Sequence, residues 1–388
     1  MLSFLFIVIQ AFLLLPFTGA TARDAGNVPL STLQRHPAAD TFDEQLQRQD
    51  AVDTVRLIFA GDVMGHEAQL AGAWCDGGDS CYHFSPTFQW VKDYISSADL
   101  AVANLEVTFA GKPYTGYPTF SSPTSLAVAL KDAGFNLLMT ANNHILDRGA
   151  QGLEQTLNTL ENLDILYTGA FRDADDRKIN YPLIINKNGF TLAFLNYSYG
   201  SNRTITKSPV IVNYLDTTQL AVDLARCREM KPDYIIACVH WGDEYKTIEN
   251  QTQQQLADFL ARNGCNLIVG SHPHVVQPIK KIAVPAADSV LVAYSLGNLI
   301  SNQRQRYSDG GILLEVTLTK TSGHVNLDSY RYEPVWVYRF PDKGVQLFRL
   351  IPVIDFLSNP DRYPEMSIED EKLLLQFFKD TRKSVHFK

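Results

Sequence analysis

From residue 55 onward, short apolar runs rich in β-branched residues alternate with segments of helical period, and this alternation restricts the possible fold. The apolar runs cover residues 55–60, 100–103, 137–140, 234–239, 267–269 and 290–294. Between two of them, Leu153, Leu157 and Leu160 recur at steps of three and four residues, as the buried face of a helix requires. The pattern predicts buried strands joined by helices, which is an α/β fold with helices covering the sheets.

After residue 301 the pattern changes to alternating strand-like segments. These segments cover 311–319, 326–338 and 345–353, and a helical pattern follows at about 367–382. We interpret them as added antiparallel strands and a closing helix that complete the second sheet of the same domain. The expected organisation is one domain over residues 53–301, with residues 302–388 as an extension packed on it.

The N-terminal segment predicts export. Residues 1–17 are apolar and shorter than the roughly 20 residues that a membrane-spanning helix needs. Ala20-Thr21-Ala22 follows and is typical of a signal peptidase site, so we expect a signal peptide over residues 1–22 and a linker over 23–52. The expected location is the periplasm or cell envelope. Because no Lys or Arg precedes the apolar run, a retained N-terminal anchor is the alternative.

The cysteines agree with an oxidising compartment. Cys75 and Cys81 flank a short loop rich in Gly and Asp, which is compatible with a local disulfide. Cys227, Cys238 and Cys265 lie in apolar segments and are interpreted as buried free thiols.

Polar residues follow each apolar run at its carboxyl end. The clusters are Gly61-Asp62-Val-Met-Gly-His66, Asn104-Leu-Glu106, Asn142-Asn143-His144-Ile-Leu-Asp147, His240-Trp-Gly-Asp-Glu244, Ser271-His272-Pro-His274 and Ser295-Leu-Gly-Asn298. In open α/β sheets, ligand sites lie outside the carboxyl ends of the strands, where the loops converge. We therefore expect these clusters to form one site.

The chemistry of these clusters indicates a metal centre. The candidate ligands are Asp62, His66, Glu106, Asn143, His240, His272 and His274. Imidazoles mixed with carboxylate and amide oxygens suit Mn, Fe or Zn and are too rich in nitrogen for a Ca or Mg cage. Seven candidates exceed the needs of one tetrahedral ion, and Glu106 can bridge two. The sequence predicts two divalent transition metal ions about 3.5–4 Å apart.

Each residue also has a structural alternative. A histidine after a strand, such as His240, is more often a satisfied core residue, and Asp62 can shape a turn or cap a helix. Asp147 fits either a helix cap or a partner that orients His144. The repetition of polar clusters after strands is what favours a functional site.

The charge balance limits the possible partners. The chain has 34 Lys and Arg against 42 Asp and Glu, a formal net charge of −8. Such a molecule repels polyanions as a whole, so we expect no nucleic-acid binding. A phosphate or an anionic polymer can bind only where metal ions or a local basic cluster reverse the field.

The ordered motifs resemble one known family. Gly-Asp-x-Met at 61–64, Asn-Leu-Glu at 104–106, His-Trp-Gly at 240–242 and Ser-His-Pro-His-Val-x-Gln at 271–277 look like the CapA/PgsA capsule-synthesis proteins, also called the poly-γ-glutamate capsule biosynthesis family. Asn-Asn-His-x-x-Asp at 142–147 and Ser-Leu-Gly-Asn at 295–298 extend the match over about residues 56–301. That family is related to calcineurin-like metallophosphoesterases. The resemblance implies a four-layer α/β/β/α sandwich of two mixed sheets with helices outside.

The resemblance also implies a role for each site residue. The first metal takes Asp62 and His274, the second takes Asn143, His240 and His272, and Glu106 takes the bridging position. His144 becomes the catalytic imidazole that protonates the leaving oxygen. Met64 stands where related phosphoesterases carry the His of an Asp-x-His motif, and His66 is the candidate to replace it.

Two functional classes follow. The first is an exported, metal-dependent hydrolase that cleaves a phosphoester, or another ester or amide, in a surface polymer. The second is a non-catalytic accessory of anionic surface-polymer synthesis or export. The expected partners are the polymer or phosphoester substrate and, by the same resemblance, a capsule-synthesis membrane complex.

Overall fold

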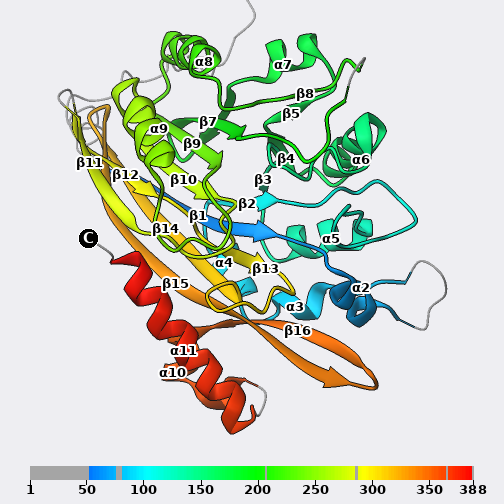
Figure 1. Ribbon diagram of the computed structural model, residues 1–388. Helices are drawn as coiled ribbons and strands as arrows, with labels where there is room; N and C mark the ends of the chain where they lie inside the picture. The colour runs from blue at the N-terminus through cyan, green and yellow to red at the C-terminus, as the bar shows by residue number, and fades with distance from the viewer. Residues whose placement is uncertain (1–51, 76–80, 206–207, 285–286, 364–365, 387–388) are drawn as a thin grey trace, which may run out of the picture. The chain divides into compact units, whose positions relative to one another are not determined.

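The computed structural model describes residues 52–75, 81–205, 208–284, 287–363 and 366–386 (Figure 1). The predicted signal peptide, and the predicted linker up to residue 51, lie outside the described residues. Within the described ranges, no helix has both the length and the apolar composition needed to cross a membrane.

All six predicted runs form strands, which are distributed over two mixed sheets. The first sheet has the order β16-β15-β14-β1-β2-β3-β4, with β13 pairing with β1. Its members are β1 (Asp53–Val63), β2 (Leu100–Leu105), β3 (Leu137–Met139), β4 (Leu166–Thr168), β13 (Asn298–Ile300), β14 (Gly310–Thr321), β15 (His324–Asp342) and β16 (Val345–Pro352). From β1 to β4 the strands are parallel, whereas β14 to β16 are antiparallel.

The second sheet has the order β11-β12-β10-β9-β7-β6. Its members are β6 (Leu183–Lys187), β7 (Phe190–Ser198), β9 (Tyr234–His240), β10 (Leu267–Ser271), β11 (Ile279–Val284) and β12 (Ala287–Ala293). The four inner strands run parallel, and an antiparallel strand lies at each edge. A small separate ladder joins β5 (Ala170–Phe171) to β8 (Ile211–Val212).

Alternating side chains place one apolar core between the sheets and another on the outer face of each. Leu57 and Phe59 of β1 belong to the core shared with Ile236 of β9, whereas Ile58 belongs to the outer core of the first sheet. Period-two alternation explains the division, because successive strand residues point to opposite faces. The structure thus has the four layers that the resemblance implies.

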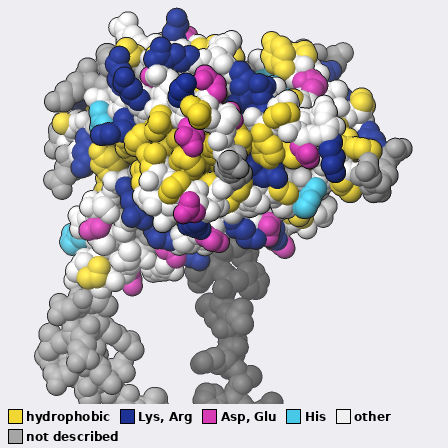
Figure 2. Space-filling view, turned by 90° about the horizontal axis from the view of Figure 1, so that it is seen from below, with side chains coloured by type: hydrophobic (Ala, Val, Ile, Leu, Met, Phe, Trp, Pro, Cys, Tyr) yellow, Lys and Arg dark blue, Asp and Glu magenta, His cyan; other side chains and the backbone are white. Residues whose placement is uncertain are grey.

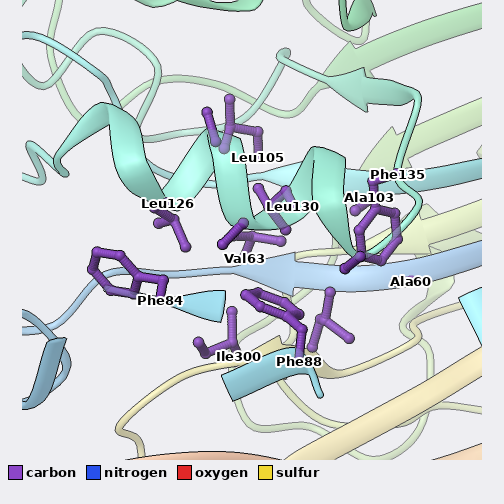
Figure 3. Packing of buried hydrophobic residues seen from close by; sticks show 14 of the residues in the cluster. Ala60, Val63, Phe84, Phe88, Ala103, Leu105, Leu126, Leu130, Phe135 and Ile300 are labelled. Atoms are coloured by element: carbon purple, nitrogen blue, oxygen red, sulfur yellow. The ribbon is translucent and has the colours of Figure 1, made fainter. Parts of the chain in front are cut away.

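Helices cover both outer faces (Figure 1). On the first sheet, Leu126 and Leu130 of α5 (Thr124–Asp132) belong to the core that contains Val63 and Leu105, as Figure 3 shows. The core on the outer face of the second sheet includes residues of α8 (Thr217–Glu229) and α9 (Gln251–Arg262). The other helices are α2 (Glu67–Ala73), α3 (Ser85–Phe88), α4 (Lys92–Ser96), α6 (Gly149–Asn162), α7 (Ala174–Asn180), α10 (Val353–Ser358), α11 (Ile368–Val385) and a 3-10 turn at Pro360–Arg362.

The C-terminal strands extend the first sheet, so our expectation that they complete the second sheet was wrong. β14 pairs antiparallel with β1, from Asp53 opposite Lys320 to Phe59 opposite Leu314. That edge of β1 is free for pairing because β2 occupies only the other edge. The predicted closing helix is α11, which packs with Trp336 and Ile351 in a separate apolar cluster.

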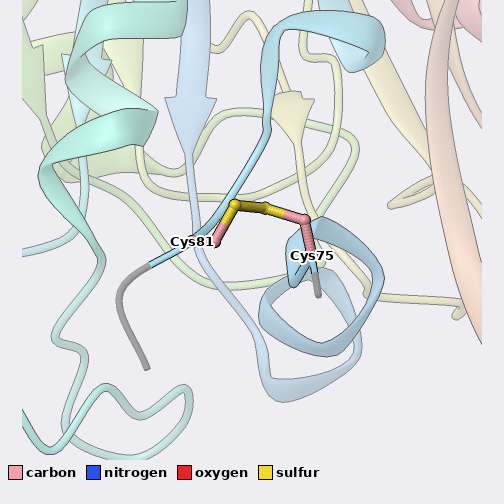
Figure 4. The surroundings of a disulfide bond; sticks show 2 residues. All are labelled: Cys75 and Cys81. Carbon is pink, nitrogen blue, oxygen red and sulfur yellow. A yellow bond between two sulfur atoms is a disulfide. The ribbon is translucent and has the colours of Figure 1, made fainter. Parts of the chain in front are cut away.

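A disulfide closes the short loop after α2. Cys75 and Cys81 are joined with their Cα atoms 5.2 Å apart (Figure 4), a usual separation for this bond. The neighbours Trp74 and Tyr82 form a β-bridge across the same loop. Cys227, Cys238 and Cys265 are buried and free, as predicted.

Gly61 allows β1 to approach the loop that precedes β13. A Cβ atom at this position would lie 1.8 Å from the carbonyl oxygen of Gly297. The same carbonyl accepts the backbone N–H of Asp62 at 3.0 Å. The absence of a side chain at Gly61 therefore helps to hold the following aspartate in place.

We predict that Gly61→Ala lowers the free energy of unfolding by about 3 kcal/mol, because two backbone segments must separate to admit the methyl group. Urea denaturation measures the loss. Gly200→Ala is the matched control, since a Cβ there meets nothing within 4 Å and that backbone has no positive φ. Equal stability of the two variants would contradict the close-approach explanation.

A buried carboxyl makes the stability of the C-terminal part depend on pH. Glu333 of β15 accepts the backbone N–H of Ile354 in α10 at 2.7 Å, and burial raises its pKa from 4.5 to about 7. Between these values the folded state holds a proton that the unfolded chain releases. The free energy of unfolding therefore falls as the pH rises from about 4.5 through 7.

We expect Glu333→Gln, which keeps the acceptor and cannot ionise, to match the wild type at pH 5 and to exceed its stability at pH 8 by about 1–3 kcal/mol. Urea denaturation at the two pH values tests the difference. Glu371→Gln, on an exposed position of α11, is the control. A wild type that gains stability relative to Glu333→Gln as the pH rises would show that the predicted direction of the pH dependence is wrong.

Candidate metal centre

The polar clusters meet where parallel strands of the two sheets end. In the first sheet, Asp62 of β1 lies in register with Asn104 of β2 and Asn298 of β13. In the second sheet, His240 of β9 lies in register with Ser271 of β10. All the predicted site residues are buried except His66, which is half-buried. The strand ends of the two sheets therefore carry the buried polar clusters.

Asn104 holds the two carboxylates of the site. Its Nδ2 atom donates to Asp62 Oδ1 at 2.8 Å and to Glu106 Oε2 at 3.1 Å. The amide itself is positioned by Asn142, whose Nδ2 donates to Asn104 Oδ1 at 3.4 Å. The result is two acidic side chains fixed side by side in a fully buried position.

Three imidazoles face these carboxylates from the second sheet. His240 has its Nδ1 atom 3.0 Å from Ser271 Oγ and its Nε2 atom 2.8 Å from Asn143 Oδ1. His274 has its Nδ1 atom 3.0 Å from Asp62 Oδ2. The third ring, His272, lies between them, with centroids 4.7 Å from His240 and 6.0 Å from His274.

The turn that carries His272 and His274 is strained. Both residues have positive φ, 100° and 57° respectively, which costs energy for side chains other than Gly. The backbone N–H of His272 donates to Asp62 Oδ2 at 3.3 Å, which ties the turn to the first sheet. This backbone conformation brings both imidazoles of the His-Pro-His turn to the carboxylates.

Two buried polar atoms in the site have no hydrogen-bond partner among the described residues. They are Glu106 Oε1 and His272 Nδ1. Glu106 Oε1 lies 3.6 Å from His240 Nε2 and 3.8 Å from His274 Nε2. Two ligand atoms about 2.1 Å from one tetrahedral ion lie roughly 3.4 Å apart, so these separations fit a shared ion better than a hydrogen bond.

The ligand atoms form two overlapping groups. Glu106, His272 and His274 form one, and Asp62, Glu106 and His240 form the other, with the ligand atoms of each group within 4.8 Å of one another. Glu106 belongs to both groups, as a bridging carboxylate would. This donor set fits divalent transition metal ions.

The electrostatics of the cluster favour a bound cation. Burial, and then the neighbouring Asp62 charge, raise the pKa of Glu106 well above its usual value. Burial, and then the neighbouring imidazoles, lower the pKa of His240 well below its usual value and that of His272 to about 3. Neutral imidazoles beside crowded carboxylates offer lone pairs and negative charge, and a cation satisfies both.

His144 and Asp147 form a separate pair beside the cluster. His144 Nδ1 lies 2.8 Å from Asp147 Oδ2, which also accepts the backbone N–H of Phe120 at 2.7 Å. On its other side, His144 Nε2 lies 3.4 Å from Asn202 Nδ2. Asp147 therefore contacts the imidazole directly, as the orienting alternative predicts, and α6 begins only at Gly149.

His66 lies apart from the two ligand groups. It is the N-cap residue of α2, and its Nδ1 atom accepts the backbone N–H of Asn302 at 3.2 Å. Burial lowers its pKa to about 4. The neighbouring Met64 is buried in the outer core of the first sheet. Neither residue belongs to the two groups, which together contain five of the seven predicted ligands. A sixth, Asn143, contacts His240.

Several contact residues have no predicted role. Asn104, Ser271 and Asn298 lie inside the predicted motifs, but such residues after a strand are also typical of turns. Tyr199 and Asn202 follow β7, a strand that no predicted run covers. The apolar sequence of β7, followed by Tyr-Gly-Ser-Asn, has the same pattern as the other strand ends. This pattern is the sequence signal that indicates a further strand end at the site.

Fold and site together define an α/β sandwich protein with a buried polar centre suited to divalent cations. Residues 56–303 match the family model described as bacterial capsule synthesis protein PGA_cap. The chain belongs to this family, which confirms the resemblance seen in its motifs.

Two curated relatives agree with this membership. The chain is 28% identical to the PGA biosynthesis protein CapA of Bacillus subtilis over 275 residues, which cover 69% of each chain. It is 25% identical to the capsule biosynthesis protein CapA of Bacillus anthracis over 360 residues, which cover 87% of this chain and 78% of that one.

Solved structures similar to this chain include two phosphatase-like proteins. One is a calcineurin-like phosphoesterase, YfkN from Bacillus subtilis, with a TM-score of 0.43 and 11% identity over 85% of this chain and 98% of that chain. The other is a phosphatase from Mycoplasma pneumoniae, with a TM-score of 0.41 and 15% identity over 79% of this chain and 98% of that chain.

We expect Glu106→Gln and His272→Ala to lower the bound divalent metal, measured by elemental analysis after dialysis, because each removes a ligand atom without a hydrogen-bond partner. Glu106→Gln also relieves the repulsion with Asp62. Without metal it should be at least as stable as the wild type, and with metal it should be less stable.

His324→Ala, on an exposed strand end, is the control and should keep the metal. His66→Ala decides whether the half-buried imidazole holds an ion: a loss of metal assigns it as a ligand, and full retention excludes it. Unchanged metal content in both Glu106→Gln and His272→Ala would rule out the proposed centre.

Proposed function

We propose that this chain is a metal-dependent hydrolase that acts on a phosphoester, or on another ester or amide, in the synthesis of poly-γ-glutamate or a related anionic surface polymer. One observation carries the proposal: the buried cluster of carboxylates and imidazoles lies beside the His144–Asp147 pair, which is not needed to hold an ion. A site that only bound a metal for stability would need no such pair.

Two divalent ions are the proposed cofactors. Asp62 and His274 would hold the first, Asn143, His240 and His272 the second, and Glu106 both. Such ions act as Lewis acids toward phosphoryl or carbonyl oxygens and make water more acidic. The unpartnered oxygen of Glu106 and nitrogen of His272 support metal binding at this site. The division between the two ions follows the resemblance to the family, whereas in the structure His272 groups with His274, and Asp62 with His240.

His144 is the proposed proton donor. Asp147 Oδ2 accepts from Nδ1, which leaves Nε2 as the nitrogen that exchanges a proton with the leaving group. The same carboxylate fixes the ring plane. The Phe120 ring packs against the imidazole edge-on, 4.7 Å between centroids, and further restricts its rotation.

Export is part of the proposal. Residues 1–22 would direct the chain to the periplasm or cell envelope, either as a cleaved signal or as a retained anchor near a capsule-synthesis membrane complex. The Cys75–Cys81 disulfide supports an oxidising compartment. Residues 53–301 would form the catalytic domain, and residues 302–388 its extension.

An anionic substrate must be attracted locally. The chain has a net charge of −8, and on the face shown in Figure 2 the Lys and Arg side chains are interspersed with Asp and Glu. That face presents no broad basic surface. The proposal therefore relies on bound cations and on individual basic side chains near the site.

We expect the metal-loaded protein to hydrolyse an aryl phosphomonoester or phosphodiester. His144→Ala should lower turnover by about 100-fold or more while the metal content stays the same, because the imidazole moves a proton and holds no ion. Asp147→Asn should lower turnover less, since it keeps a polar partner for the ring. Colorimetric release of the aryl alcohol measures both.

His324→Ala should behave as the wild type in the same assay. Full activity of His144→Ala would contradict the assigned role. A wild type that holds metal and turns over no ester or amide would favour the accessory function. The observation that specifically favours that function is Met64, which stands where related phosphoesterases have a histidine.

A further inference from the structure

The segment after β7 lies directly against the metal centre. The backbone N–H of Tyr199 donates to the carbonyl of His240 at 2.8 Å, and that of Asn202 donates to the carbonyl of Asn143 at 2.9 Å. The Tyr199 ring lies 4.5 Å from the His272 ring, between centroids. Two predicted ligands thus position this segment, although it holds no ligand itself.

A groove of about 420 Å³ begins at this segment. The two tyrosines of its lining, Tyr199 and Tyr214, are 48% and 41% exposed, so part of each ring is open to the groove. Its other walls are mainly aliphatic, formed by Leu146, Ile205, Val210 and Val212. Because Leu146 follows His144 by two residues, the groove starts beside the proposed proton donor.

Arg203 is the cation of this groove. Its Nη1 atom donates to the carbonyl of Asp147 at 3.2 Å. Among the described residues, no carboxylate lies within ion-pair distance of its guanidinium group. A guanidinium has five N–H donors, so several remain for a ligand.

We propose that this groove binds the part of the substrate that adjoins the scissile bond, and that it selects an aliphatic chain bearing a carboxylate. Arg203 recognises the carboxylate, and the aliphatic wall and the two tyrosines pack against the methylene groups. A polyol-phosphate chain would supply the charge but little apolar surface for these walls. The inference rests on the proposed function, because it assumes that the adjoining site acts on the bound chain.

The test measures binding by calorimetry with the full-length, metal-loaded protein. The probe is a γ-linked glutamate tetramer, and its neutral tetramethyl ester and a glycerol-phosphate tetramer are compared with it. The wild type should bind the acid at least tenfold more tightly than either of the others. Arg203→Ala should lose about tenfold in affinity, with Arg203→Lys in between.

Tyr214→Ala should bind the acid a few-fold more weakly, whereas Arg262→Ala, a surface arginine of α9, should bind as the wild type does. His144→Ala should bind the tetramer normally although it lacks turnover. Failure of the proposed hydrolase function and failure of the groove proposal therefore give different results. Equal binding of acid and ester, unchanged binding by Arg203→Ala, or preference for the glycerol phosphate would each overturn the proposal.

Discussion

Asp62 and Glu106 lie buried side by side at the ends of neighbouring strands, and the site depends on how their negative charge is compensated. A single amide, Asn104, donates to both, which holds them but neutralises neither. Isolated buried carboxylates are among the most costly groups in a protein interior. Two of the facing imidazoles, His240 and His272, do not supply the missing charge, because burial lowers their pKa values. A bound cation resolves this conflict.

The two sheets divide the tasks of the site. The first supplies the carboxylates on β1 and β2, and the second supplies the imidazoles on β9 and in the turn after β10. The apolar core between the sheets holds these two halves in fixed relation, through residues such as Leu57 and Ile236. Since the ligand atoms come from both sheets, loss of packing between them would separate oxygen from nitrogen donors. Stability and metal affinity are therefore coupled in this fold.

Much of the arrangement could be predicted because two patterns coincide along the chain. Apolar runs predicted six strands, and the polar residues after them predicted which side chains meet. The pairing of β14 with β1 could not be predicted, because alternating strands carry no signal for the sheet they join. The position of His66 could not be predicted either, because it depends on a contact between residues 236 positions apart. The Nδ1 atom of His66 accepts the backbone N–H of Asn302.

The groove beside the site illustrates what strand ends and loops each contribute. The ligands and the His144–Asp147 pair are buried and held by several hydrogen bonds, so their positions follow from the sheets. Tyr199, Arg203 and Tyr214 instead lie on exposed segments whose side chains face few constraints. Exposed loop residues can change without disturbing a core, whereas the buried donors cannot. Within one fold, the strand ends consequently constrain the buried polar centre, whereas the segments that border the groove are freer to vary.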